Sequence, residues 1–264
     1  MDPPGFFYLH LIFSRPYPII GSEAQSVWAM RPVERYDFMR NSEEENSRKE
    51  KAEESKKEIL KIAYGLFQKY GYTKTSMRQI AADAGVSHGL ITYYFKNKRE
   101  VAVELVKGKM GQFAEAVHRY VDWENEPALY SAVLERLSYT VFSTPIFFEF
   151  YKDILREYIM FEVLADSGIE TDLRIWKKYC PELSEEDAIR TATYGNYVSA
   201  CMESAMVLYG KEKLYLKESI PDSVFRVSIG MWHFPDEQKI IEECCRRSRE
   251  IVEHILWENP ELYK

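Results

Sequence analysis

The sequence predicts an all-α protein, in which a small N-terminal three-helix domain precedes a larger helical body. Two observations carry this prediction. Apolar residues recur at spacings of three and four along most of the chain, and no stretch alternates polar and apolar residues as a half-buried strand would. With 264 residues and 46% apolar content, the chain is long enough to bury a substantial core.

The first predicted helix begins at Ser47 and carries one apolar stripe. Its members recur at helical spacing: Ile59, Ile62, Ala63, Leu66, Phe67 and Tyr70. Gly71 then ends the helix as a left-handed cap. By contrast, residues 1 to 46 mix aromatic residues and prolines without helical period, and we expect them to be a disordered extension. Met39 lies just before a polar run, which makes it a hypothetical alternative start.

Two short helices follow. Ser76 and Gln79 have the spacing of a capping box, so we expect a helix to begin there and to end at Gly85. After one turn residue, Ser87 can cap a third helix that runs to about Phe95.

The tight turn between these helices indicates a helix-turn-helix. Gly85 supplies the positive φ that the turn requires, and small alanines around it let the helices approach. Gly89, near the start of the next helix, costs about 1 kcal/mol of helix stability relative to alanine. Close approach to a DNA backbone would offset that cost.

Charge is distributed unevenly along the chain. The net charge is −7 overall, but residues 48 to 108 carry 13 basic and 7 acidic side chains, a net charge of +6. The flanking segments are acidic, with −3 for residues 1 to 47 and −10 for residues 109 to 264. A phosphate-facing module attached to a large acidic domain gives this pattern, as does a solvated lysine-rich helix.

Three runs of residues resemble the N-terminal domain of the TetR family. They are Thr75 to Ala81 (TSMRQIA), Ala84 to Gly89 (AGVSHG) and Tyr93 to Lys98 (YYFKNK). The resemblance extends from about Lys57 to Leu105, and beyond it the chain is similar to the family only in being helical. It implies a DNA-binding domain over residues 47–97 and an effector-binding and dimerisation domain over 98–264.

The resemblance also implies which residues meet double-stranded operator DNA. Ser76 and Arg78 are expected beside the DNA backbone, and Tyr93, Tyr94 and Lys98 at phosphates. The groove-facing set is Ser87, His88, Gly89, Leu90, Thr92 and Tyr93. Thr92 departs from the aromatic residue that the family often has there, which puts one phosphate contact in doubt. Two alternatives stay open: the tyrosines are core aromatics, or His88 is only a solvated surface side chain.

Further helices are predicted beyond Lys98. The first is long and begins at Lys98. The others are expected at Ala128–Ser143, Ile146–Leu164, Leu173–Tyr179, Glu185–Tyr209 and Asp236–Trp257. In the family the last two form the dimer interface, and a symmetric homodimer would let two recognition helices enter a palindromic site.

The body is rich in aromatic residues and methionine, most of which must be core. Some are candidates for an apolar effector pocket: His118, Tyr139, Phe142, Phe147, Tyr151, Tyr158, Trp176, Tyr197 and Met202. Glu157 and Glu203 are further polar candidates for orienting a ligand. The leading interpretation is a dimeric repressor released from its operator by a small apolar or amphipathic effector.

Two alternatives remain. One is a regulator controlled by a protein partner, without a small-molecule ligand. The other is an enzyme with its active site in the body, although no catalytic motif supports it. We expect no catalytic residues, no cofactor and no metal site. No CxxC spacing occurs among the four cysteines: Cys180, Cys201, Cys244 and Cys245. No run is long enough to cross a bilayer and no secretory signal is evident, so we expect a cytoplasmic protein with no membrane partner.

Overall fold

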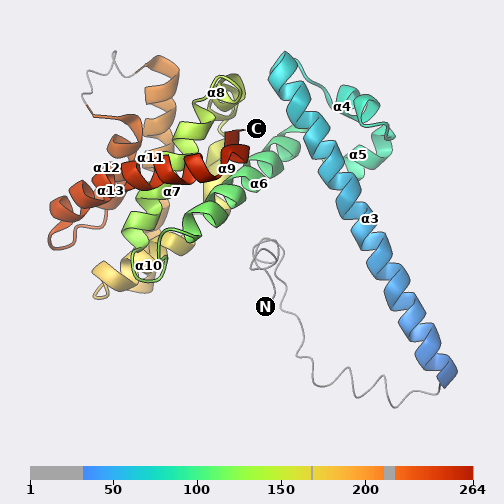
Figure 1. Ribbon diagram of the computed structural model, residues 1–264, viewed down its shortest axis with the longest axis horizontal. Coiled ribbons are helices and arrows are strands. Elements are labelled where there is room, and N and C mark those ends of the chain that lie inside the picture. Colours follow the sequence, from blue (N-terminus) through green and yellow to red (C-terminus); the bar gives the residue numbers. More distant parts are fainter. Residues whose placement is uncertain (1–31, 168, 211–217, 264) are drawn as a thin grey trace.

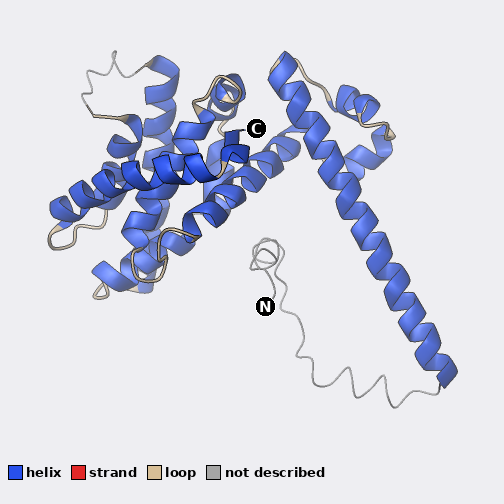
Figure 2. Cartoon of the chain, viewed as in Figure 1, coloured by secondary structure: helices blue, strands red, loops and turns tan. Residues whose placement is uncertain are grey.

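The computed structural model describes residues 32–167, 169–210 and 218–263 (Figure 1). Within these ranges the chain forms eleven α-helices and one short 3-10 helix, and no β-strand occurs there (Figure 2). The predicted all-α class is confirmed. No helix in the described ranges is both long and apolar enough to cross a membrane.

The N-terminal helix-turn-helix module consists of α4 (Met77–Asp83), α5 (His88–Tyr94) and the C-terminal part of α3 (Pro32–Tyr70). α3 begins well before Ser47, so residues 32 to 46, expected to be disordered, continue the helix. Proline is tolerated at a helix start, and the glutamates and arginines that follow are good helix formers. The rest of the predicted extension, residues 1 to 31, lies outside the described residues.

The body packs nine further elements together, and α6 leads into it from beside α3 (Figure 1). They are α6 (Lys98–His118), α7 (Pro127–Phe142), α8 (Phe148–Arg156), α9 (Ile159–Ser167), α10 (Ile169–Tyr179), α11 (Glu185–Tyr209), α12 (Ile220–Gly230), α13 (Glu237–Glu258) and the 3-10 helix η3 (Pro260–Tyr263). α13 packs along α7, and α11 packs against α12. The predicted bounds of α11 are confirmed.

Two predictions about the body were wrong. The single helix expected over Ile146–Leu164 is divided into α8 and α9, because Tyr158 adopts a left-handed backbone with φ 57°. Helix α12 is absent from the predicted helices, and a proline, Pro221, lies at its start. Here the proline occupies the first turn, where no backbone N–H is needed, and the Ser219 hydroxyl caps the helix by accepting from the Asp222 N–H.

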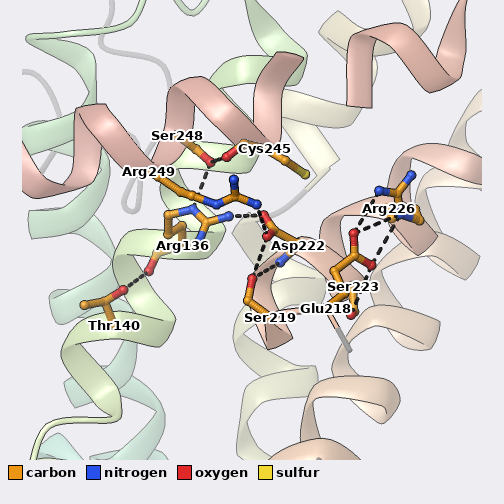
Figure 3. Close-up of polar contacts among 10 residues, drawn as sticks. All are labelled: Arg136, Thr140, Glu218, Ser219, Asp222, Ser223, Arg226, Cys245, Ser248 and Arg249. Carbon is orange, nitrogen blue, oxygen red and sulfur yellow. Dashed lines mark hydrogen bonds and ion pairs between the residues drawn. The ribbon is translucent and has the colours of Figure 1, made fainter. Parts of the chain in front are cut away.

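A buried ionic network ties α7, α12 and α13 together (Figure 3). Asp222 on α12 is 2% exposed and accepts hydrogen bonds from Arg136 on α7 and, at 2.5 Å, from Arg249 on α13. Arg136 also donates to the Ser248 hydroxyl at 2.9 Å. Burial would raise the pKa of Asp222, but hydrogen bonds from Ser219 and Arg249 and the charge of Arg136 outweigh it and hold the pKa below its usual value.

Candidate functional site

The two short helices of the module meet as the sequence predicts. The Ser76 hydroxyl accepts from the Gln79 N–H at 3.2 Å and caps α4, and the Ser87 hydroxyl accepts from the Leu90 N–H at 3.1 Å and caps α5. Between them, Gly85 has φ +65°. These local features fix the angle between α4 and α5, and the predicted helix-turn-helix is confirmed.

The module has an apolar inner side and a polar outer side. Ile80, Ile91 and Phe95 are fully buried and hold α4 and α5 against α3. Tyr93 points outward and is 81% exposed, although it is a large aromatic residue. All the residues expected at the groove or the adjacent backbone are exposed: Ser76, Arg78, Ser87, His88, Gly89, Leu90, Thr92 and Tyr93.

Two residues on this side also have contacts within the module. The Thr92 hydroxyl donates to the His88 carbonyl at 2.7 Å, so its hydrogen is used within α5. Tyr94 is half-buried, and its ring lies 5.5 Å from that of Tyr93 and 6.5 Å from that of Phe95. Its packing therefore agrees with a core aromatic residue at the edge of the exposed face.

Gly89 is not required by packing within the chain. A Cβ built at this position would meet only the Ser87 hydroxyl oxygen, at 3.8 Å, which is an ordinary contact. Its φ is not in the left-handed region. The protein alone therefore gives no reason for a helix-weakening residue here, whereas a surface that approaches from outside would.

Lys98 holds the module to the body. Its ammonium donates to the Tyr72 carbonyl at 2.7 Å and to the Thr73 carbonyl at 3.4 Å, and lies 4.2 Å from the centre of the Tyr72 ring. Burial lowers the pKa of Lys98, against the charges of Glu157 and Asp153. Asp153, on α8, accepts the Tyr72 N–H at 3.0 Å. The backbone N–H and the carbonyl of Tyr72 are thus both held by side chains of the body. The sequence did not predict these two contacts.

Some of the candidate ligand residues come together in the body. Phe142 stacks on Tyr151, with ring centres 5.4 Å apart, and lies 6.2 Å from Phe147. Tyr139 and Met202 pack against a neighbouring small apolar cluster. This group lies where α7, α8 and α11 meet, and we call it the aromatic core.

Two carboxyl groups are buried beside the aromatic core. Glu203 on α11 accepts a hydrogen bond from the Tyr151 hydroxyl. Burial raises the pKa of Glu203 to about 7, and burial together with Glu203 raises the pKa of Glu135 on α7 well above its usual value. Glu135 Oε1 is buried and has no hydrogen-bond partner among the described residues. Sequence reasoning named Glu203 but missed Glu135, because nothing local marks it as buried.

The other candidates lie apart from the aromatic core. His118 packs with Trp123 and Tyr130 and lies 3.2 Å from the Tyr130 hydroxyl. Burial lowers the pKa of His118, and the charge of Arg174 adds to this. Trp176 donates to the Leu183 carbonyl at 3.1 Å. Two candidates are well exposed at the surface: Tyr158 (65%) and Tyr197 (45%).

Comparison with known proteins connects the module to a family. The model described as "Bacterial regulatory proteins, tetR family" matches residues 59 to 105. A 58-residue segment is 41% identical to the fatty acid metabolism regulator protein of Bacillus subtilis (strain 168) and covers 22% of this chain and 30% of that protein. A 91-residue segment is 31% identical to the HTH-type transcriptional regulator HbdR of Aromatoleum sp. (strain CIB), covering 34% and 37%.

Solved structures extend the likeness to the body. The crystal structure of RolR in complex with the ligand resorcinol superposes with a TM-score of 0.52 at 14% identity, over 77% of this chain and 95% of that one. At this identity the match shows the fold. The segments matched to the regulators of Bacillus subtilis and Aromatoleum sp. span about a third of the length of those proteins. Residues 59 to 105 thus match the TetR-family model, and this match lies in the helix-turn-helix module and the start of α6.

Proposed function

We propose that the protein is a homodimeric repressor that binds operator DNA through the exposed face of α4 and α5. The exposed Tyr93 carries this proposal, because a large aromatic side chain left in solvent on the capped helix α5 is available to contact a partner outside the fold. Arg78 on α4 supplies positive charge on the same module, and the open surface of Gly89 permits close approach of a phosphate. Base contacts would come from His88 and Leu90.

The DNA-binding proposal is tested by selecting binding sites from random duplex DNA and measuring affinity by fluorescence anisotropy at several salt concentrations. Arg78→Ala should weaken binding and reduce the salt slope by about 1, because one phosphate contact is lost. Lys177→Ala removes a positive charge from the exposed side of α10 in the body and should leave both the affinity and the salt slope unchanged. No retention of DNA at low salt, or equal effects of the two variants, would refute the proposal.

A dimer is proposed through α11 and α13. Large apolar side chains are exposed on these helices: Ile189, Tyr194, Tyr197, Val198, Tyr209 and Trp257. A second copy would cover such a surface and place two α5 helices on a two-fold site. Light scattering should give a dimer at micromolar concentration. Val198→Glu should shift it toward monomer, whereas Ile146→Glu, at an exposed apolar site outside these helices, should not. A stable wild-type monomer contradicts the proposal.

Control by a small-molecule effector is the last part of the proposal. The aromatic core with its buried carboxyl groups supplies apolar walls and polar handles, and the clamp on Tyr72 joins the body to the module. RolR is a neighbour of the same fold with a bound ligand, resorcinol. As a DNA-binding regulator it would act in the cytoplasm. Native mass spectrometry of the purified protein should detect a bound small molecule. Adding that molecule to the complex of protein and DNA should release the DNA. A protein that loses DNA only with a protein partner would refute effector control.

A further inference from the structure

A cavity of about 230 Å³ lies between the module and the body. Leu60 and Tyr64 of α3 form one wall, Leu105 and Gly108 of α6 form another, and the Phe142 and Phe147 rings close it on the body side. It is smaller than a typical drug-sized pocket, so its occupant has one or two rings or a short chain. Because its walls come from both parts, an occupant touches the module and the body at once.

Lys61 also lines the cavity, but it is paired with Glu58 at 3.8 Å, so Lys109 gives the cavity its charge. Its ammonium lies 5.0 Å from the centre of the Phe147 ring and 5.6 Å from that of Phe113. Lys109 makes no hydrogen bond or ion pair within the described part of the chain. Burial lowers its pKa, against the charge of Glu261. The acidic lining residue, Glu104, is already paired with Lys56 at 3.2 Å. The lining charge without a direct ion pair is therefore positive.

Gly108 keeps the cavity open. It lies within the 21-residue helix α6, where glycine costs about 1 kcal/mol relative to alanine. A Cβ built at Gly108 meets no atom within 4 Å, so no neighbouring helix requires the glycine. Gly111, three residues later, is equally unobstructed but does not line the cavity. A side chain at Gly108 would occupy space that the fold leaves empty.

We propose that this cavity binds a small organic anion with a flat apolar part, such as an aromatic carboxylate. The carboxylate pairs with Lys109 and the ring packs against Leu105, Phe142 and Phe147, where its face and edges find aromatic neighbours. Bound there, the anion bridges α3 and α6 and biases the angle of the module. This last step rests on the proposed effector-controlled repressor, whereas the binding itself does not.

Full-length protein is titrated by calorimetry with naphthoate and with neutral naphthamide of nearly the same shape. Naphthoate should bind at least about tenfold more tightly, because only it can pair with Lys109. Lys109→Met should abolish this preference and Lys109→Arg should keep it. Gly108→Leu should abolish binding of both compounds, whereas Gly111→Leu, matched in helix and residue type, should bind as wild type does.

Three results overturn the proposal: no naphthoate binding at millimolar concentration, equal affinity for the two compounds, or an unchanged preference in Lys109→Met. Normal binding by a folded Gly108→Leu variant, checked by circular dichroism, places the compound elsewhere and also overturns it. Fluorescence anisotropy with DNA distinguishes failure of the anion site from failure of the repressor proposal. If naphthoate binds as expected but no DNA is retained, the repressor proposal fails and the anion site stands.

Discussion

The helix-turn-helix module and the body treat polar groups in opposite ways. The module buries an almost purely apolar core around Phe67, Ile91 and Phe95, and its polar side chains face solvent. Thr75 is the exception, and its hydroxyl bonds to the nearby Gly71 carbonyl at 2.9 Å. In the body, Asp222 and Glu203 are buried between helices that are distant in sequence.

The contrast matches what each part must do. A core without polar groups keeps the module rigid, so that its outward face can be fixed for DNA. Buried ionisable groups are costly unless paired, and their state depends on protons, ligands and the placement of neighbouring helices. The body is therefore the part in which a small chemical change can alter helix packing. The predictions below test this difference.

The largest effect is expected at the buried ionic network of the body. Asp222→Asn leaves Arg136, whose side chain is 11% exposed, without its charge partner and should cost about 3 kcal/mol or more in the free energy of unfolding. Glu218→Gln is the control, because its pair with Arg226 is about one-third exposed and should contribute under about 1 kcal/mol. Urea unfolding measures both. Equal losses would mean that burial does not distinguish the two pairs.

The second effect is a pH dependence set by Glu203. Its pKa is raised in the folded protein, so folding binds a proton, and stability falls as pH rises from about 4.5 to about 7. Glu203→Gln should reduce this fall and be more stable than wild type at pH 8 by roughly 2 kcal/mol. Part of the slope remains, because burial also raises the pKa of Asp172 to about 7 and that of Glu135 above its usual value.

Melting temperatures at several pH values check the Glu203 prediction, with the exposed Glu186→Gln on the same helix as the control. The contribution of Asp222 to stability changes with pH in the opposite direction. Its pKa is depressed, so its contribution is present above the ordinary aspartate pKa and is lost at lower pH. A wild-type stability that increases from pH 5 to pH 8 would contradict the assignment of Glu203.

Glycine substitutions in the module should separate folding from DNA binding. Gly85→Ala forces alanine into φ +65° and should destabilise the protein by about 1 kcal/mol. Gly89→Ala meets no obstruction and should stabilise α5 by up to about 1 kcal/mol, yet weaken DNA binding by about tenfold if a phosphate approaches there. Thermal unfolding and anisotropy measure the two effects. Unchanged DNA affinity in Gly89→Ala would contradict the proposed close approach of a phosphate to Gly89.

The smallest effect is expected at Lys98, where the two parts meet. Lys98→Met removes two hydrogen bonds to the Tyr72 and Thr73 carbonyls and should cost about 1 kcal/mol or less in stability. If the ammonium also reaches a phosphate, as the resemblance implies, the salt slope of DNA binding should fall by about 1. A weakened affinity with an unchanged slope would assign Lys98 to the junction alone.

The features that the sequence predicted correctly lie mainly in the module, and those that it missed lie mainly in the body. The caps Ser76 and Ser87 and the turn at Gly85 are local signals, and each was located correctly because its partners lie within a few residues. The break at Tyr158 depends on tertiary packing and has no local signal. The contact of Tyr151 with Glu203 joins residues 52 positions apart, which periodicity along one helix cannot reveal.

The two hydrogen bonds that hold the backbone of Tyr72 limit how the module can move relative to the body. Because Asp153 and Lys98 hold the two peptide groups of this residue, we expect the loop after α3 to stay with the body if the rest of the module tilts. The module would then rotate about Tyr72, and the displacement of each residue would grow with its distance from Tyr72. Helix α4 follows this loop directly and α5 follows α4 (Figure 1), so a rotation about the loop displaces the recognition helix. In a two-fold dimer the two movements would add, and a slight tilt would put both recognition helices out of register with the DNA.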